Sequence, residues 1–202
     1  MKRNIKLIFL LFLILDFMLF CALLFKGPKT DASLGVAMNE DYKKVKIEND
    51  KIYSQKFRSE LNDLHEVSFL TLRSNEKLEG ILNVKIFDDN DKLISETNFN
   101  ADQILNKNLM KFGLEWTYES QGKYYRMDIC ASDLSGNAYF AIIDEKNAEK
   151  FLIDGEKQKE TLVYYYTGTK RNKTYLWYPV MIAAVGFVLF VVLNGEVRNG
   201  KK

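Results

Sequence analysis

The sequence predicts a mainly β protein: an antiparallel β-sandwich, jelly-roll-like in architecture, flanked by N- and C-terminal transmembrane α-helices. Two observations predict this class. Long apolar stretches lie near both ends of the chain, and between them about nine short runs rich in β-branched and aromatic residues alternate with turn-forming residues, with no long amphipathic helix. At 202 residues and 47% hydrophobic residues, the chain is large enough to form a sandwich core as well as two helices.

The first apolar stretch contains only two charged side chains between Ile5 and Phe25, namely Lys6 and Asp16. About 20 apolar helical residues cross a hydrocarbon core of about 30 Å. We therefore expect a cytoplasmic N-terminus over 1–4 and a transmembrane signal-anchor helix over 5–26. A cleaved signal peptide is the alternative, but its apolar region is typically about 7–15 residues long and ends at small residues. Here Cys21 follows the bulky Phe20, which disfavours lipoprotein cleavage.

The second apolar stretch, Leu176 to Leu193, contains no charge. It predicts a transmembrane helix over 175–194 and a cytoplasmic tail over 195–202. Basic residues mark the cytoplasmic side of short flanks, and they occur at both ends of the chain: Lys2, Arg3, Lys6, Arg198, Lys201 and Lys202. We therefore expect a two-pass protein of the plasma (inner) membrane whose central region is extracytoplasmic. Three basic residues just before the second stretch oppose this orientation, but long domains are translocated largely regardless of charge.

Between the helices we expect a linker over 27–42 and a sandwich over 43–170. In the run 80–87, Leu82, Val84 and Ile86 alternate with more polar residues and are expected to face the core. The acidic run 88–91 has turn chemistry and joins two strands. The segment 101–108 is either one helical turn or a loop that crosses between sheets. The candidate strands are 43–48, 52–58, 66–73, 80–87, 92–98, 109–116, 123–131, 137–143 and 160–167.

The central region is acidic, because residues 31–169 contain 18 Lys and Arg against 25 Asp and Glu, a net charge of −7. A nucleic-acid partner is therefore excluded, since it requires a concentrated positive face. Cys21 and Cys130 are expected in different compartments, so no disulfide joins them. The single histidine, His65, and the absence of catalytic motifs favour a protein without enzyme activity, metal or cofactor. Asp88, Asp89 and Asp91 have the oxygen ligands that calcium takes, but not the spacing of an EF-hand loop.

Two aromatic pairs are candidate contacts with a cell-surface glycan or a partner protein. Trp116 and Tyr118 are two residues apart on one strand, as are Tyr164 and Tyr166 on another, so each pair shares a face. Exposed rings offer apolar platforms on which sugar rings can lie. The alternative is that each pair faces the sandwich core, where Tyr and Trp bury much area.

Asp16 is the candidate contact with a membrane partner. An ionised carboxylate at the middle of a bilayer costs about 2.5–3.5 kcal/mol on insertion scales, and such residues usually face a partner or a cavity. The second apolar stretch has no basic residue to pair with it, although its small residues Ala183, Ala184 and Gly186 allow close helix packing. Two interpretations stay open: Asp16 pairs with a polar or basic group of another membrane protein, or it is protonated and hydrogen-bonded within the helix pair.

Part of the central region resembles a known class of extracytoplasmic domain in its strand and turn residues. It extends from Gln55 and Phe57 through Leu64, Val67 and Phe69, and it includes the segments 80–82, 86–88 and 122–125. This stretch resembles the extracytoplasmic β-sandwich found between transmembrane helices in bacterial envelope and polysaccharide-biosynthesis membrane proteins. The resemblance implies a bacterial source, an architecture similar to carbohydrate-binding jelly rolls, and no catalytic residues to transfer.

Together these features predict a non-enzymatic, membrane-anchored accessory protein. Its extracytoplasmic sandwich would bind carbohydrate or join a complex that assembles a cell-envelope polysaccharide. Two alternatives stay open: a glycan-processing enzyme that uses paired carboxylates, and a self-assembling structural subunit of the envelope.

Overall fold

The computed structural model describes residues 2–26, 29–37, 40–74, 76–145, 149–171 and 173–199. The chain divides into two compact units. One unit comprises residues 31–170 and contains the strands. The other comprises residues 1–30 and 171–202 and contains the two helices. Each is described by itself.

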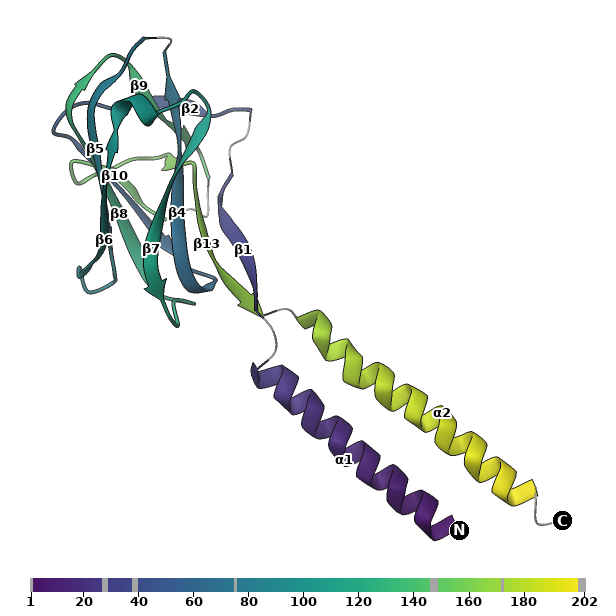
Figure 1. Ribbon diagram of the computed structural model, residues 1–202. Coiled ribbons are helices and arrows are strands. Elements are labelled where there is room, and N and C mark those ends of the chain that lie inside the picture. Colours follow the sequence, from purple (N-terminus) through teal and green to yellow (C-terminus); the bar gives the residue numbers. More distant parts are fainter. Residues whose placement is uncertain are drawn as a thin grey trace. The chain divides into compact units, whose positions relative to one another are not determined.

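Residues 31–170 form two antiparallel sheets stacked face to face, so the predicted mainly β, sandwich-like fold is confirmed (Figure 1). The first sheet contains, in order, β1 (Lys29–Val36), β13 (Tyr164–Arg171), β4 (Asn62–Arg73), β9 (Ala138–Ile143) and β12 (Thr161–Leu162). Two more strands belong to it: β2 (Lys43–Lys46), which pairs with β9, and β7 (Asn108–Thr117), which pairs with β4. The second contains, in order, β11 (Glu156–Lys157), β10 (Phe151–Ile153), β3 (Ile52–Arg58), β8 (Tyr124–Ser135), β5 (Glu79–Phe87) and β6 (Leu93–Asn100).

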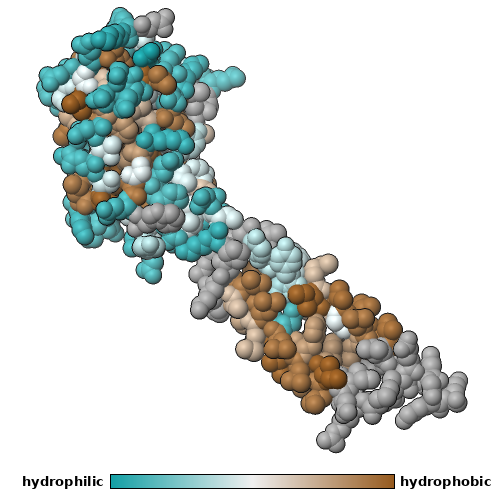
Figure 2. All heavy atoms as spheres, viewed as in Figure 1, coloured by the Kyte–Doolittle hydropathy of each residue, from teal (hydrophilic) through white to brown (hydrophobic). Residues whose placement is uncertain are grey.

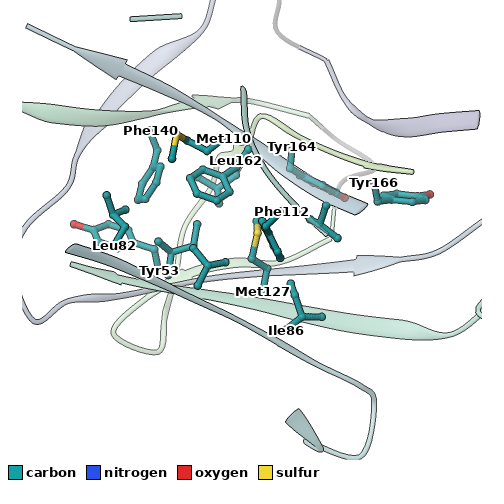
Figure 3. Packing of buried hydrophobic residues seen from close by; sticks show 14 of the residues in the cluster. Tyr53, Leu82, Ile86, Met110, Phe112, Met127, Phe140, Leu162, Tyr164 and Tyr166 are labelled. Carbon is teal, nitrogen blue, oxygen red and sulfur yellow. The ribbon is translucent and has the colours of Figure 1, made fainter. Parts of the chain in front are cut away.

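The core lies between the facing sheets and is rich in aromatic rings (Figure 3). The alternation predicted on β5 is confirmed, because Leu82, Val84 and Ile86 are all buried. Tyr53 of β3 meets Phe140 of β9 edge to face, with 5.1 Å between ring centroids, so the two sheets are joined by ring contacts of the favourable geometry.

The predicted linker over 27–42 is wrong over part of its length, because β1 lies within it. The side chains of Ala32, Leu34 and Val36 pack against the core from one face of this strand. The contacts of Ser33 with Thr167 and of Gly35 with Tyr164 and Tyr165 place β1 beside β13 in antiparallel register. The strand was not recognised because its apolar alternation is short and includes no aromatic residue, and pairing with β13 contributes more to its conformation than intrinsic propensity does.

Of the two possibilities predicted for 101–108, the structure has the single helical turn, the 3₁₀ helix η1 (Ala101–Gln103). Other segments differ in detail from the prediction. The predicted strand over 160–167 is divided at Val163, because Thr161 and Leu162 pair with β9 whereas Tyr164 onward pairs with β4. β10 and β11 were not predicted, and they are short strands of three and two residues.

The other unit contains α1 (Lys2–Lys26) and α2 (Trp177–Asn199), and η2 (Lys173–Leu176) precedes α2. Within α1, Leu7–Leu24 has a mean hydropathy of 3.0 and is long and apolar enough to cross a membrane, either as an anchor or as a signal sequence. The apolar stretch of α2 whose side chains are described, Trp177–Val192, is shorter than 18 residues. Figure 2 shows hydrophobic side chains gathered over the helices and largely hydrophilic side chains over the visible face of the sandwich.

Candidate functional site

A cavity of about 570 Å³, here called the tyrosine pocket, lies where the turn between β5 and β6 meets the turn between β7 and β8. Its volume falls within the usual range for small-molecule sites, about 300–1,000 Å³. It combines carboxylates, ammonium groups, hydroxyls and apolar surface, and its lining residues are Asp88, Asp89, Asn90, Lys92, Leu93, Ile94, Glu115, Thr117, Tyr118, Lys123, Tyr124 and Tyr125.

Two of the tyrosine rings in this pocket are available to a ligand. Tyr118 is 72% exposed and Tyr124 is 46% exposed. The guanidinium carbon of Arg58 lies 5.8 Å from the centroid of the Tyr124 ring, within cation–π range. Arg58 is itself oriented by its Nε, which donates to the carbonyl of Gly122 at 3.2 Å. The sequence prediction thus identified Tyr118 but did not include Tyr124.

Two carboxylates of the acidic turn at the edge of the pocket are engaged in contacts that hold the turn in place. Asp88 Oδ1 accepts hydrogen bonds from the backbone N–H groups of Asn90 and Lys92, each at 2.9 Å. Asp91 forms an ion pair with Arg126, which also contacts Asp128 at 3.1 Å. Among the described residues, no group of three or more His, Cys, Asp or Glu side chains is placed to hold a metal ion. Asp88 therefore shapes the turn, while Asp89 and Glu115 remain as polar groups of the pocket.

Tyr164 and Tyr166 are buried, which favours the second of the two possibilities that the sequence left open for this pair, a place in the sandwich core. Each is 5% exposed, and their centroids lie 5.7 and 5.3 Å from that of Phe57 in the core. Figure 3 shows both hydroxyl groups pointing away from Phe140 and Leu82. The two tyrosines thus belong to the sandwich core, because their rings extend from β13 toward Phe57 in the opposite sheet. The side chain of Trp116 lies outside the described residues.

The hydroxyl ends of these two tyrosines line a second cavity, of about 440 Å³, here called the acidic pocket. Its other lining residues come from four separate parts of the chain: Leu34, Gly35, Val36, Arg58, Glu60, Glu145 and Glu149. Burial raises the pKa of Tyr164, and the neighbouring Tyr166 and Glu149 raise this pKa further. The sequence prediction missed this pocket, since no motif links residues so far apart.

Gln55 holds the backbone that carries Glu149, one of the acidic residues of this pocket. Its side chain is fully buried, and its amide nitrogen donates to the carbonyl oxygens of Lys56 at 2.7 Å and Glu149 at 3.2 Å. Its amide oxygen accepts from the Thr161 hydroxyl at 2.9 Å and from the backbone N–H of Leu162 at 3.1 Å. One buried amide thus joins β3, β12 and the backbone that carries Glu149.

The helix unit contains the remaining predicted residues. Asp16 lies on the same face of α1 as Phe9 and Phe12, which contact α2: the Phe9 and Phe190 rings stack with centroids 4.2 Å apart, and Phe12 lies against Gly186. The Asp16 Oδ1 atom is buried and has no hydrogen-bond partner. Ala183 is half-buried, and Ala184 is exposed.

The single histidine and the two cysteines form no site among the described residues. His65 Nδ1 lies 2.9 Å from the Asp63 carbonyl oxygen, a contact between neighbouring parts of β4. Burial raises the pKa of the Cys130 thiol, which disfavours the reactive thiolate. Both cysteines are free thiols.

Comparison with known proteins gives likenesses in structure alone. No family model matches the chain, and no curated protein matches it. One solved structure, the VP2 subviral particle of infectious bursal disease virus, shows a TM-score of 0.34 and 11% identity over 73% of this chain and 34% of that one. Xylanase10C (mutant E385A) from Cellvibrio japonicus, in complex with xylopentaose, shows a TM-score of 0.36 and 9% identity over 69% of this chain and 26% of that one. The flagellar cap protein FliD of Escherichia coli shows a TM-score of 0.24 and 9% identity over 96% of this chain and 72% of that one. The chain spans about a third or less of the length of the first two of these structures.

Proposed function

We propose that this protein is a non-enzymatic, membrane-anchored recognition protein whose sandwich binds carbohydrate in the tyrosine pocket. The observation that carries the proposal is the exposure of Tyr118 and Tyr124 at one cavity of sugar-binding size. A tyrosine ring offers an apolar face together with a polar hydroxyl, which suits a ligand that has both C–H faces and hydroxyl groups.

The polar groups around these rings support the same ligand class. Asp89, Glu115, Lys92 and Lys123 all line the pocket and supply both acceptors and donors. A sugar needs both, because each of its hydroxyl groups donates and accepts. Asp88 already accepts two backbone hydrogen bonds within its own turn, which makes it a poor candidate for one of the paired carboxylates of a hydrolase. This favours binding of a sugar over its hydrolysis.

Binding of the detergent-solubilised full chain to an array of cell-envelope polysaccharides tests the proposal. Tyr118→Ala and Tyr124→Ala should each weaken binding about tenfold, whereas Leu105→Ala, which removes a similarly exposed apolar side chain outside the pocket, should leave binding unchanged. Failure of the native protein to bind any glycan would contradict the proposal. Cleavage of the bound glycan would instead support the enzyme alternative.

We also infer that α1 and α2 both span the plasma membrane, with the termini cytoplasmic and the sandwich extracytoplasmic. The hydropathy of α1 and the basic residues at both ends of the chain support this arrangement. It can be tested in a background in which Cys21 and Cys130 are replaced by alanine. A membrane-impermeant maleimide should label Lys157→Cys in intact cells but should label Lys201→Cys only after permeabilisation. The reverse pattern would overturn the orientation.

Asp16 is the proposed contact with a donor group of a second membrane protein. The support is that Asp16 Oδ1 has no hydrogen-bond partner among the described residues of the helix pair, so the pair does not satisfy this carboxylate, while the side chain as a whole is only half-buried. Purification in mild detergent followed by mass spectrometry should recover a partner with the native chain and lose it with Asp16→Leu. Met18→Leu, an exposed apolar position on the same helix, serves as the control. Equal recovery with all three proteins would contradict this contact, and a homo-oligomer without another partner would favour the structural-subunit alternative.

A further inference from the structure

The acidic pocket has chemistry distinct from that of the tyrosine pocket. Three carboxylates, those of Glu60, Glu145 and Glu149, line a cavity of about 440 Å³. None of the three has an ion-pair partner among the residues that the structure describes. The guanidinium of Arg58, the one cation among the lining residues, is oriented by the Gly122 carbonyl and by the Tyr124 ring. The pocket therefore has a negative field that the described side chains do not neutralise.

An unpartnered tyrosine side chain gives independent evidence of a ligand. Tyr164 is 95% buried as a residue, it lines this cavity, and its hydroxyl has no hydrogen-bond partner in the described part of the chain. Among the described residues the buried side-chain atom without a partner is Asp16 Oδ1, so the Tyr164 hydroxyl is open to the cavity and can bond with a ligand there. The neighbouring Tyr166 hydroxyl accepts the backbone N–H of Glu60 at 3.2 Å, so its own proton remains available to donate.

The wall of the cavity is held rigidly. Gly35 of β1 lies so close to the carbonyl of Tyr164 that no other residue fits there, and Gln55 fixes the backbone of Glu149 from the core side. The backbone at Tyr164 and at Glu149 is thus held in place around an open space. The carboxylates are not close enough together to form a metal-binding group. An organic cation, which spreads its contacts over several ångströms, fits this arrangement better than a metal ion does.

We propose that the acidic pocket binds a ligand that carries a protonated primary amine together with hydroxyl groups, as an amino sugar does. The ammonium group pairs with one of the carboxylates of Glu60, Glu145 and Glu149 in the negative field of the other two, and it donates to the Tyr164 hydroxyl oxygen. The Tyr166 hydroxyl donates to a ligand oxygen. The acidic pocket and the tyrosine pocket are lined by different residues. Binding of an amine in the acidic pocket therefore does not depend on carbohydrate binding in the tyrosine pocket.

The test compares two probes with the same sugar backbone and length: a short oligomer of glucosamine, whose amines are protonated, and the fully N-acetylated oligomer, whose amides are neutral. Calorimetric titration in detergent of the full chain carrying Tyr118→Ala, which weakens the tyrosine pocket, should show binding of the glucosamine oligomer and not of its acetylated form. Binding should weaken as salt shortens the Debye length from about 30 Å to about 10 Å. Glu149→Gln should weaken binding about fivefold, and Tyr164→Phe, which keeps the ring packing, about threefold.

Glu156→Gln is the matched control, because it removes the same charge from an exposed position outside the pocket and should change affinity less than about twofold. Three outcomes would overturn the proposal: no binding of the glucosamine oligomer, equal binding of both oligomers, or the same loss with Glu156→Gln as with Glu149→Gln. Tyr118→Ala should leave this binding unchanged, which separates failure here from failure of the tyrosine pocket.

Discussion

Replacement of Gln55 by leucine removes the buried amide that joins β3, β12 and the backbone of Glu149. Four hydrogen bonds are lost, and the Thr161 hydroxyl, the Leu162 N–H group and two carbonyl oxygens lose a partner. With about 1 kcal/mol for each hydrogen bond, partly offset by the apolar leucine side chain, the free energy of unfolding should fall by about 3 kcal/mol. For a domain of about 140 residues this lowers Tm by about 10 °C.

Differential scanning calorimetry of the full chain in detergent measures this change. Gln121→Leu is the matched control, because this glutamine is exposed and its side chain accepts one hydrogen bond, from Asn62 at 3.2 Å. Thr161→Val should cost about 1 kcal/mol alone and less in the Gln55→Leu background, since both substitutions remove the same bond. A Tm for Gln55→Leu within about 3 °C of that for Gln121→Leu would refute the structural role of the buried amide.

Three further predictions concern the sandwich. Phe57→Ala should lower the free energy of unfolding by about 3–5 kcal/mol, because its ring is fully buried against Tyr125, Tyr164 and Tyr166; a loss below about 1.5 kcal/mol in urea denaturation would contradict this. Gly35→Val should detach β1 from β13, because its φ is +153° and its side chain would meet the Tyr164 carbonyl; limited proteolysis should then cleave within residues 29–37, as it should not in the Ser33→Val control. Burial raises the pKa values of Tyr53, Tyr125, Tyr164 and Tyr166 above the ordinary 10.0, so the unfolded chain loses these protons first and stability should fall as the pH rises above about 10. Tyrosinate absorbance at about 295 nm should therefore appear at higher pH in the native protein than in concentrated urea, and identical titration curves would disprove the burial effect.

The sandwich could be predicted from the sequence wherever a strand has one apolar face. Leu82, Val84 and Ile86 alternate with polar neighbours, and burial follows that pattern. β1 has only a short alternation, of Ala32, Leu34 and Val36, beside small or polar residues such as Ser33 and Gly35, and its place depends on pairing with β13. Non-local pairing of this kind leaves little trace in local sequence.

The sites were harder to predict than the strands. Gln55 is fully buried although glutamine is mostly exposed in proteins, and its four partners become apparent only in three dimensions. The acidic pocket joins Leu34, Glu60, Glu149 and Tyr164, which are far apart in the sequence. By contrast, the turn chemistry of the acidic run 88–91 was correctly read, since Asp88 bonds the backbone of its own turn.

The contact between α1 and α2 has a thermodynamic consequence for a domain that neither helix belongs to. Phe9 stacks on Phe190, and the sandwich is the chain between these two helices. While the helices remain paired, the unfolded sandwich is a closed loop rather than a free chain, and it has fewer conformations available. For a loop of more than 100 residues, closure of this kind is worth on the order of 5 kcal/mol, about as much as a disulfide across the same span. The helix pair therefore acts as a reversible cross-link for the sandwich, and separating the helices destabilises the strands without breaking any contact between them.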